Sequence, residues 1–319
     1  MTSGGAPAPR FSVVVPAFNA ASTLAETLDA ILAQTFTDWE CIVVDDGSTD
    51  QTPHLAETYA DKDLRIRVIR QANQGTAGAY NTGVSTANGE LVVICSADDV
   101  LLPEHLSTMS SFVAQEPGHD IYTSNGYFWW PGDSPEVFYP SGEGDWADSP
   151  TLADTICSLE LADVIRLCFY SVGATYRRGL YAAVGGYRHG VYGEDYDFWL
   201  RAMASGARHR YLPRPLSLHR VSRTQKSASL EVVYRSDIRL LTDLQHDFEL
   251  SEADQRAIAE SIQQRERKIA LLHRPWRLDR DLLVPGAKAI AIRIMGRRRS
   301  RRIYRLVKSA LGISRSGRP

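Results

Sequence analysis

The 319-residue chain has only four cysteines, and no two of them have the spacing of a Cys-x-x-Cys pair. This spacing excludes the usual cysteine-based zinc and redox motifs. Cys41 and Cys95 lie inside apolar runs that predict strands, where an unmodified thiol packs as a small hydrophobic group. The cysteine pattern fits a reducing compartment, so we expect a cytoplasmic protein.

Long apolar runs are also missing. A helix needs about 20 predominantly apolar residues in a row to cross a bilayer, and no stretch of this sequence reaches that length. Residues 1–10 are rich in Gly, Pro and Ala and lack the apolar core of a signal peptide. We therefore expect no membrane span, and a disordered N-terminus over residues 1–10.

The sequence lacks the common nucleotide-binding fingerprints as well. The glycine- and amide-rich segment Asn73–Asn81 has no Gly-Lys-Ser/Thr, so it is not a phosphate-binding P-loop. No Gly-x-Gly-x-x-Gly motif follows the first predicted strand, which argues against a nicotinamide cofactor. Two interpretations of Asn73–Asn81 stay open: a loop that brings backbone and amide groups to a nucleotide, or close packing of a helix on a sheet.

Charge is distributed unevenly along the chain. Of the 36 Lys and Arg residues, 11 follow Asp281, where the chain has no Asp or Glu. The rest of the chain carries 25 basic and 38 acidic residues, a net charge of −13, and no nucleic-acid partner is expected. The basic amphipathic tail 282–319 is either a solvated helix or an interfacial helix on an anionic membrane. The second interpretation predicts a peripheral location on the inner face of the cell membrane.

What the sequence does contain is a regular alternation of strand and helix patterns in its first half. Short apolar runs predict strands at Phe11–Val15, Cys41–Val44, Ile66–Ile69 and Leu91–Cys95. Helical patterns follow the first three, near Leu24–Leu32, Asp50–Tyr59 and Thr76–Ala87. Fully apolar strands separated by helices predict an α/β fold with a doubly wound sheet. From residue 230 to 272 the pattern is helical and charged.

In such a sheet the carboxyl ends of the strands line the ligand crevice. Here those ends are Pro16-Ala17-Phe18-Asn19, Asp45-Asp46-Gly47-Ser48 and Asp98-Asp99. A strand-to-helix turn explains Gly47, Ser48 and Asp50, but it does not explain two adjacent carboxylates. Because Asp45 and Asp46 can accept hydrogen bonds from a base and from ribose hydroxyls, this turn predicts a nucleotide site.

Asp98 and Asp99 end a buried strand, where two carboxylates repel each other unless a cation neutralises them. Oxygen ligands favour Mg²⁺ or Mn²⁺, which are usually shared between carboxylates and substrate phosphates. The alternative is a cap on the helix that begins near Pro103. Beside the first acidic site, metal binding is the better interpretation. His219 is either structural or a contact to the metal or the diphosphate.

Asp195 lies between Glu194 and Asp197 near the predicted start of a helix. It is either a cap whose charge complements the helix dipole or a general base whose pKa is tuned by the neighbouring carboxylates. The spacing alone leaves both interpretations open.

Together these motifs resemble the family 2 glycosyltransferases, which have the GT-A fold. The matching segments are Val13–Asn19, Gln34–Phe36, Trp39–Glu40, Val44–Asp50, Asn73–Gly75, Asn81, Gly83, Gly89–Glu90, Ser96–Asp99 and Gly193–Asp197. The resemblance implies a Rossmann-like, mixed, mostly parallel sheet flanked by helices over residues 11–226. It also implies a nucleotide-binding half (11–125) and an acceptor half (126–226). The charged helical pattern that follows predicts a helical C-terminal extension (227–319).

The resemblance further implies inverting transfer of a sugar from a nucleoside-diphosphate sugar, in the first place a UDP-sugar, to a hydroxyl of a saccharide or lipid-linked acceptor. Asp195 would take the proton of that hydroxyl. A divalent cation, Mn²⁺ or Mg²⁺, held by Asp98 and His219 would stabilise the leaving diphosphate. Phe18 would lie against the base, Asp46 would bind its edge, and Asp45 would support the loop. The full set of implied nucleotide-sugar contacts is Pro16, Phe18, Asn19, Asp45, Asp46, Gly75, Asn81, Ser96, Asp98 and Asp99.

One position departs from the family pattern. Relatives usually have Asp-x-Asp at the metal site, whereas Ser96 takes the first position here, which weakens the expected metal affinity. Two alternatives therefore remain. A non-catalytic nucleotide-sugar-binding or membrane-scaffold protein is supported by Ser96. A sugar nucleotidyltransferase would need a glycine-rich loop with Arg or Lys where the chain has Pro16–Asn19.

Overall fold

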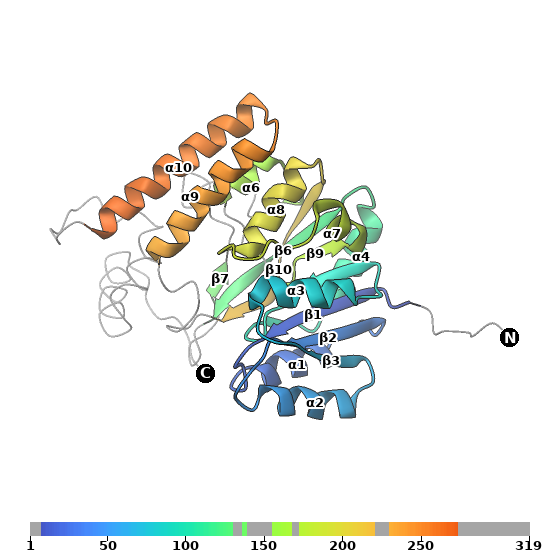
Figure 1. Cartoon of the computed structure of the whole chain (residues 1–319). Helices are drawn as coiled ribbons and strands as arrows, with labels where there is room; N and C mark the ends of the chain where they lie inside the picture. The colour runs from blue at the N-terminus through green and yellow to red at the C-terminus, as the bar shows by residue number, and fades with distance from the viewer. Residues whose placement is uncertain (1–7, 130–135, 139–154, 168–171, 221–229, 274–319) are drawn as a thin grey trace, which may run out of the picture.

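The computed structural model describes residues 8–129, 136–138, 155–167, 172–220 and 230–273. In the first half, strands and helices alternate (Figure 1): β1 (Phe11–Ala17), α1 (Leu24–Leu32), β2 (Trp39–Asp45), α2 (Thr52–Lys62), β3 (Ile66–Arg70), α3 (Gly75–Ser85), β4 (Leu91–Ile94), β5 (Val100–Leu101) and α4 (His105–Gln115). The four strands and three helices predicted here are all present, each with its ends within three residues of the expected positions.

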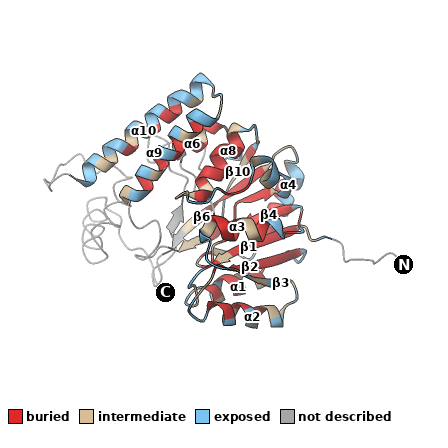
Figure 2. Ribbon diagram, viewed as in Figure 1, coloured by how far each residue is buried: buried red, intermediate tan, exposed pale blue. Residues whose placement is uncertain are grey.

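The first strands form the parallel part of one sheet. In the order β3-β2-β1-β4, every neighbouring pair is parallel. Helices cover both faces, which is why the strands are buried between two helical layers in Figure 2. Val13 and Val15 of β1 point to the core beneath α1, α2 and α4, whereas Val14 points to the core beneath α3.

The second half adds the rest of the sheet. Its elements are β6 (Ile121–Trp129), β7 (Glu136–Phe138), β8 (Cys157–Leu159), α6 (Leu161–Leu167), β9 (Thr175–Arg177), α7 (Arg178–Val184), α8 (Glu194–Ala204) and β10 (His209–Arg220). The order continues from β4 as β9-β6-β10-β5. β9 is antiparallel to β4 and β6, while β10 is parallel to β6. The mixed α/β sheet expected from the sequence is confirmed.

The stretch before His219 contains Pro213 and Pro215, and proline is rare inside strands because it donates no backbone hydrogen bond. In the structure this stretch is part of strand β10, and its register with β6 shifts between Leu212 and Pro215 and again between Pro215 and Leu218. These irregularities accommodate the prolines. His219 therefore lies near the end of a strand of the sheet.

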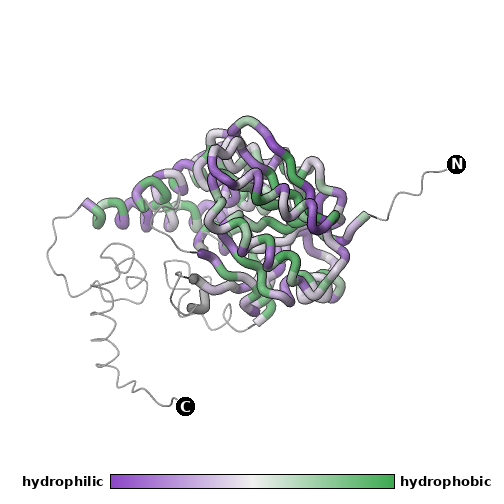
Figure 3. The backbone as a smooth tube through the Cα atoms, turned by 90° about the horizontal axis from the view of Figure 1, so that it is seen from below, coloured by the Kyte–Doolittle hydropathy of each residue, from purple (hydrophilic) through white to green (hydrophobic). Residues whose placement is uncertain are grey.

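A helical hairpin of α9 (Leu230–Asp247) and α10 (Glu252–Leu272) follows, which confirms the helical extension. α9 contacts α8 and α10 contacts α6, so the hairpin lies beside these two helices (Figure 1). Asp237 and Arg265 form a buried ion pair of 2.9 Å between its helices. Figure 3 shows hydrophilic and hydrophobic segments alternating along the hairpin, as in amphipathic helices.

Several sequence expectations lie outside the described residues. These are the basic tail 282–319, residues 1–7 of the expected disordered N-terminus, and parts of the expected acceptor half. Within the part of the chain that the structure describes, no helix has the length and apolarity needed to cross a membrane.

Candidate active site

The ends of the parallel strands meet at one edge of the sheet. Their register pairs Ala17 of β1 with Asp45 of β2, and Val14 of β1 with Ile94 of β4. The turns that follow these three strands are therefore neighbours. They contain most of the polar and acidic residues that the sequence points to.

The turns after β1 and β2 are joined to each other by hydrogen bonds. The Asn19 backbone N–H donates to the Ser48 hydroxyl at 2.9 Å, and the Asn19 side-chain oxygen accepts the Thr49 N–H at 2.9 Å. Asn19 has a φ of 49°, in the left-handed region that asparagine tolerates better than most residues. The preceding Phe18 is half exposed, so its ring is accessible to a ligand.

The two carboxylates at the end of β2, Asp45 and Asp46, are buried and differently engaged. Asp46 accepts two hydrogen bonds at one oxygen, from the Gln71 side-chain amide at 2.7 Å and from the Gln74 backbone N–H at 2.9 Å. Asp45 lies 3.4 Å from the Arg70 guanidinium, and its Oδ2 makes no hydrogen bond to the described residues. Both carboxylates lie at the proposed nucleotide loop, and the division of roles between them stays a prediction.

The two predicted contacts on α3 differ in their surroundings. Gly75 has a φ of 76°, and a Cβ added there would meet nothing within 4 Å, so its backbone is open to approach. Asn81 donates to the Tyr187 carbonyl at 2.8 Å and accepts the Tyr187 N–H at 2.9 Å. The structure thus engages the Asn81 amide with protein backbone, and its contact with a nucleotide stays a prediction.

Asp98 and Asp99 follow β4 and face the end of β10. The Arg220 backbone N–H donates to Asp99 at 3.0 Å, and the Arg220 guanidinium donates to the Asp98 carbonyl at 2.9 Å. The His219 ring lies 3.2 Å from the same Asp99 carboxylate. Burial and then the neighbouring Asp99 raise the pKa of Asp98 to about 6. The structure therefore brings Asp98, Asp99 and His219 together.

This set of groups fits a cation that is shared with a ligand. Among the described residues, no three His, Cys, Asp or Glu side chains form a complete metal site. The raised pKa of Asp98 nevertheless records two carboxylates crowded in a partly buried place, which a cation would relieve. Mg²⁺ and Mn²⁺ commonly take one or two carboxylates and complete their shell with phosphates and water. Which of Asp98, Asp99 and His219 would hold such an ion stays a prediction.

Tyr80 of α3 is a site residue that the sequence patterns do not predict. It is buried, it interacts with Ser96, and its ring packs on that of Tyr187 at 4.8 Å. Burial first, and then the charges of Asp195 and Glu194, raise the pKa of its hydroxyl well above the usual range. Tyr80 thus lies between the end of β4 and the start of α8. Its one sequence signal is being the single aromatic residue of α3.

Asp195 lies in the first turn of α8, two residues after Gly193, whose φ is 80°. Its carboxylate accepts the Tyr196 backbone N–H at 2.8 Å. The neighbouring Asp197 is buried and forms an ion pair of 2.7 Å with Arg201, one turn further along. Asp197 is therefore engaged in an ion pair within α8.

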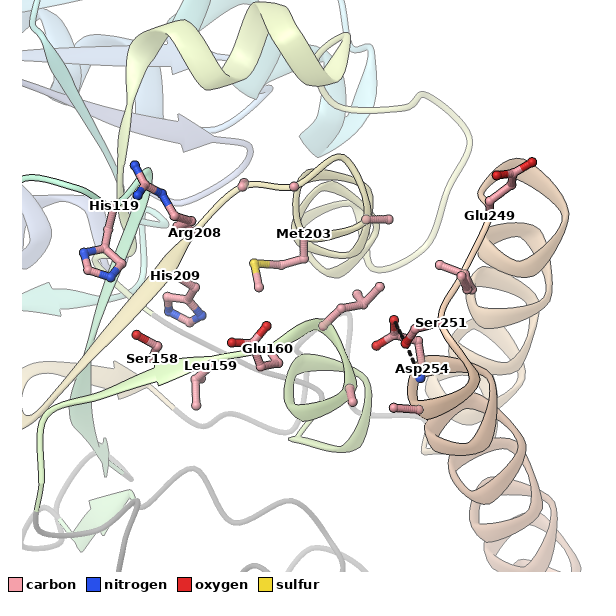
Figure 4. A pocket seen from close by; sticks show the side chains of 17 residues that line it. His119, Ser158, Leu159, Glu160, Met203, Arg208, His209, Glu249, Ser251 and Asp254 are labelled. Carbon is pink, nitrogen blue, oxygen red and sulfur yellow. Dashed lines mark hydrogen bonds between the residues drawn. The ribbon is translucent and has the colours of Figure 1, made fainter.

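A separate cavity of about 520 Å³ lies away from these residues (Figure 4). It is lined by Met203 near the end of α8, His209 at the start of β10 and Ser251 between α9 and α10. Asp195 and His219 lie at the other ends of α8 and β10. The cavity therefore lies outside the candidate active site.

Curated proteins similar to the chain are glycosyltransferases. Glycosyltransferase GlyG of Streptococcus pneumoniae is 38% identical over 133 residues, which are 41% of this chain and 44% of GlyG. The PGL/p-HBAD biosynthesis glycosyltransferase of Mycobacterium bovis is 31% identical over 205 residues, 63% of this chain and 72% of the relative. The chain thus matches less than half of GlyG but most of the mycobacterial protein.

Solved structures share the fold at low identity. TarS of S. aureus in complex with UDP-GlcNAc has a TM-score of 0.66 and 22% identity, covering 88% of this chain and 79% of TarS. The mannosyltransferase PcManGT of Pyrobaculum calidifontis, in complex with GDP-Man and Mn²⁺, has a TM-score of 0.61 and 19% identity, covering 96% of this chain and 88% of PcManGT. Both likenesses support the GT-A type of fold.

Two family models match the chain. The model described as glycosyl transferase family 2 matches residues 12–146, and the model described as glycosyl transferase family group 2 matches residues 91–271, more than half of the chain. Together with the mycobacterial relative, these matches cover the sheet, the acidic strand ends and the helical hairpin. The chain belongs to glycosyl transferase family 2.

Proposed function

We propose that this glycosyltransferase transfers a sugar, with inversion, from a nucleoside-diphosphate sugar to a hydroxyl of a saccharide or lipid-linked acceptor. A UDP-sugar is the proposed donor. The observation that carries the proposal is the meeting of acidic groups at one edge of the sheet, with Asp46 after β2, Asp98 after β4 and Asp195 at the start of α8. These three carboxylates suit nucleotide binding, cation binding and proton transfer, respectively.

The donor's nucleotide is proposed to lie against the turns after β1 and β2. The accessible Phe18 ring offers a flat apolar surface to the base. Asp46, whose Oδ1 is held by Gln71 and Gln74, is proposed to accept from the base edge. The ribose and diphosphate then extend toward Ser96 and Asp98 at the end of β4. The other proposed contacts are Pro16, Asn19, Asp45, Gly75 and Asp99. The sequence also predicts Asn81 as a contact, but the Tyr187 backbone engages its amide, so Asn81 is not among the proposed contacts.

A divalent cation, Mn²⁺ or Mg²⁺, is proposed to be held by Asp98, with His219 beside it. When bound, the ion neutralises charge on the diphosphate leaving group. Arg220 binds the turn that contains Asp98 and Asp99. Its backbone N–H donates to the Asp99 carboxylate, and its guanidinium donates to the Asp98 carbonyl. These contacts fix the turn, so the Asp98 side chain needs little rearrangement to meet a ligand.

Asp195 is proposed to act as the general base. It takes the proton of the acceptor hydroxyl while the hydroxyl oxygen forms a bond to the anomeric carbon. The bond from that carbon to the diphosphate oxygen breaks, and the nucleoside diphosphate leaves. Attack from the face opposite the leaving group inverts the anomeric carbon. The Tyr196 N–H orients the carboxylate for this step through its hydrogen bond to one oxygen.

The ligands of the structural neighbours support this assignment of donor and ion. TarS binds UDP-GlcNAc in its solved complex, and PcManGT binds GDP-Man and Mn²⁺. We also propose how the chain is divided: residues 11–125 bind the donor, residues 126–226 bind the acceptor, and residues 227–319 are an extension. Its tail, 282–319, would hold a cytoplasmic enzyme at the inner face of the cell membrane.

A thermal-shift screen tests the donor. Purified protein is heated with UDP-, GDP- and other nucleotide-sugars, with and without MnCl₂, and a UDP-sugar with Mn²⁺ is expected to give the largest stabilisation. Release of sugar from that donor, with water as acceptor, then provides a rate. Failure of every nucleotide-sugar to stabilise the protein would contradict the proposal.

Asp195→Asn tests the base. The variant keeps the shape of the side chain but cannot take a proton, so sugar release is expected to fall roughly 100-fold or more while UDP still binds. Asp243→Asn, on the partly exposed face of α9, is the matched control and should keep the parent rate. A parent rate in Asp195→Asn would show that the base lies elsewhere.

Ser96 favours one alternative, a non-catalytic nucleotide-sugar-binding protein. Replacing the first carboxylate of a metal site with a hydroxyl weakens ion binding without removing the nucleotide loop. This alternative predicts that a UDP-sugar stabilises the protein but is not turned over, with or without Mn²⁺. The same rate measurement therefore separates the two functions.

A further inference from the structure

We infer that Asn81 is a positioning residue that joins the donor side of the site to Asp195. The inference rests on the proposed function, because it assigns Asn81 a part in the step that Asp195 performs. In this role the Asn81 side chain does not contact the nucleotide. It holds the backbone segment that leads into α8.

The Asn81 amide is used by contacts within the protein. Its Nδ2 donates to the Tyr187 carbonyl at 2.8 Å, and its Oδ1 accepts the N–H of the same residue at 2.9 Å. The Tyr181 hydroxyl also donates to Oδ1, at 3.1 Å, and the His189 ring lies 3.4 Å from Nδ2. A side chain that donates to and accepts from one backbone residue fixes both its place and its orientation.

The segment that Asn81 holds is rich in glycine and depends on side chains from other elements. Besides Asn81, Arg201 donates to the Val184 and Gly186 carbonyls, and Ser236 donates to the Tyr192 carbonyl. Four of the residues from the end of α7 to the start of α8 are glycines with positive φ: Gly185, Gly186, Gly190 and Gly193. Glycine backbone loses more conformational freedom on ordering than any other residue, so contacts from outside must set its path. Asp195 follows Gly193 by two residues, and a shift of the segment therefore moves the start of α8.

The Tyr187 side chain connects this segment to α8, because its ring packs against a residue of that helix. The ring is buried and stacks on the Phe198 ring of α8, with 4.5 Å between the ring centroids. It also packs on the Tyr80 ring of α3, with 4.8 Å between the centroids. Asn81 fixes the Tyr187 backbone while the two rings fix its side chain. α3 and α8 therefore clamp one residue between them, and Asp195 lies on the first turn of the second helix.

The same helix is tied to the proposed nucleotide loop. The Gln74 N–H, just before α3, donates to Asp46 at 2.9 Å. The Thr82 hydroxyl donates to the Gln71 side chain at 2.6 Å, and Gln71 in turn donates to Asp46 at 2.7 Å. α3 thus contacts Asp46 on one side and, through Asn81, the Asp195 segment on the other. This continuous set of contacts is the physical basis for coupling donor binding to the base.

Asn81→Ala tests the inference with binding and turnover measured separately. UDP titrated in MnCl₂ is expected to bind with the parent Kd. Release of sugar from the best UDP-sugar is expected to fall on the order of 10- to 100-fold, because a displacement of about 1 Å at a reacting group costs that much. Ser85→Ala is the matched control: Ser85 is exposed on α3, and its hydroxyl bonds to the Thr82 carbonyl. A weakened Kd with unchanged kcat would overturn the inference.

A second comparison separates positioning from general damage. Asn81→Ala is made again in the Asp195→Asn background, and its residual rate is followed under single-turnover conditions with excess enzyme. If Asn81 acts through Asp195, it lowers that rate no further, whereas an equal fold-loss in both backgrounds overturns the inference. Asn81→Asp keeps both acceptor contacts but sets a carboxylate oxygen against the Tyr187 carbonyl, which repels it, so its rate should fall at least as far as that of the alanine variant. A parent chain that binds no UDP contradicts the proposed function instead.

Discussion

Ser96 is an uncharged residue next to the carboxylates of Asp98 and Asp99. Asp98 and Asp99 already place two carboxylates in a partly buried turn, and the pKa of Asp98 is raised as a result. A serine adds no charge there, and it interacts with the buried Tyr80. Because Ser96 and Tyr80 carry no charge, the site has less repulsion between carboxylates, when no cation is bound, than it would have with a carboxylate at position 96. For the same reason the site attracts a cation less strongly.

Ser96→Asp is therefore expected to strengthen cation binding. A third carboxylate adds charge beside Asp98, so the Mn²⁺ concentration for half-maximal sugar release should fall roughly tenfold, since ligand charge sets affinity at such sites. The measurement is sugar release against MnCl₂ concentration. Ser96→Asn is the control, because it has a similar shape without the charge. Equal Mn²⁺ dependence in the two variants would rule out charge as the cause.

Residue-level prediction from the sequence reaches the acidic groups but not their partners. Asp45, Asp46, Asp98 and Asp99 are accessible to sequence reasoning because each follows an apolar strand, and strand ends of a parallel sheet share one edge. The partner of Asn81 is not accessible in this way, since Tyr187 lies 106 residues further along the chain. No local pattern encodes a contact that only tertiary packing creates.

At the scale of elements, the parallel half of the sheet is predictable and the rest is not. β1, β2 and β4 are short apolar runs, so their composition predicts that they are buried. β9 has only three residues, too few for a periodic signal. β10 contains two prolines and several charged residues, and its neighbours β6, β8 and β5 make it a strand. Context overrides propensity most strongly in strands.

β10 is also held by a buried histidine at the start of α4. The His105 Nδ1 donates to the Leu216 carbonyl of β10 at 3.1 Å, and its ring is fully buried. Burial lowers the pKa of His105 from 6.5 to about 4. The unfolded chain therefore binds a proton in a pH range where the folded chain does not. The free energy of unfolding is unaffected by His105 above pH 6.5 and falls as the pH drops from 6.5 to 4.

The loss from His105 over that window is expected to be on the order of 3 kcal/mol, at about 1.4 kcal/mol per pKa unit. His209, whose pKa burial lowers to about 3, adds to it. Urea unfolding of the parent and of His105→Asn between about pH 4 and 7 measures the effect. Asn can place an N–H donor near the position of Nδ1 and does not titrate, so its stability should depend less on pH. Identical pH slopes for the two proteins would contradict this assignment.

At the scale of the whole molecule, charge separates the chain into an acidic body and a basic tail. The residues up to Asp281 have a net charge of −13, and the remainder carries 11 basic residues and no acidic one. The helical hairpin leads toward that tail. Val232 near the start of α9 and Leu271 and Leu272 at the end of α10 are exposed apolar side chains on the same end of the hairpin. An apolar end followed by a basic segment is the combination that favours an anionic membrane surface.

Deletion of residues 282–319 tests this arrangement. Each basic residue near an anionic surface contributes about 1 kcal/mol, so the parent should sediment with vesicles containing phosphatidylserine and the shortened chain should stay in the supernatant. Added salt should release the parent, because screening shortens the reach of these charges to a few ångströms. A variant with Arg301, Arg302, Arg305 and Lys308 changed to Gln keeps the length of the tail and should bind weakly. Phosphatidylcholine vesicles serve as the uncharged control. If the shortened chain sediments with anionic vesicles as the parent does, the membrane contact lies in the body of the molecule and the tail has another role.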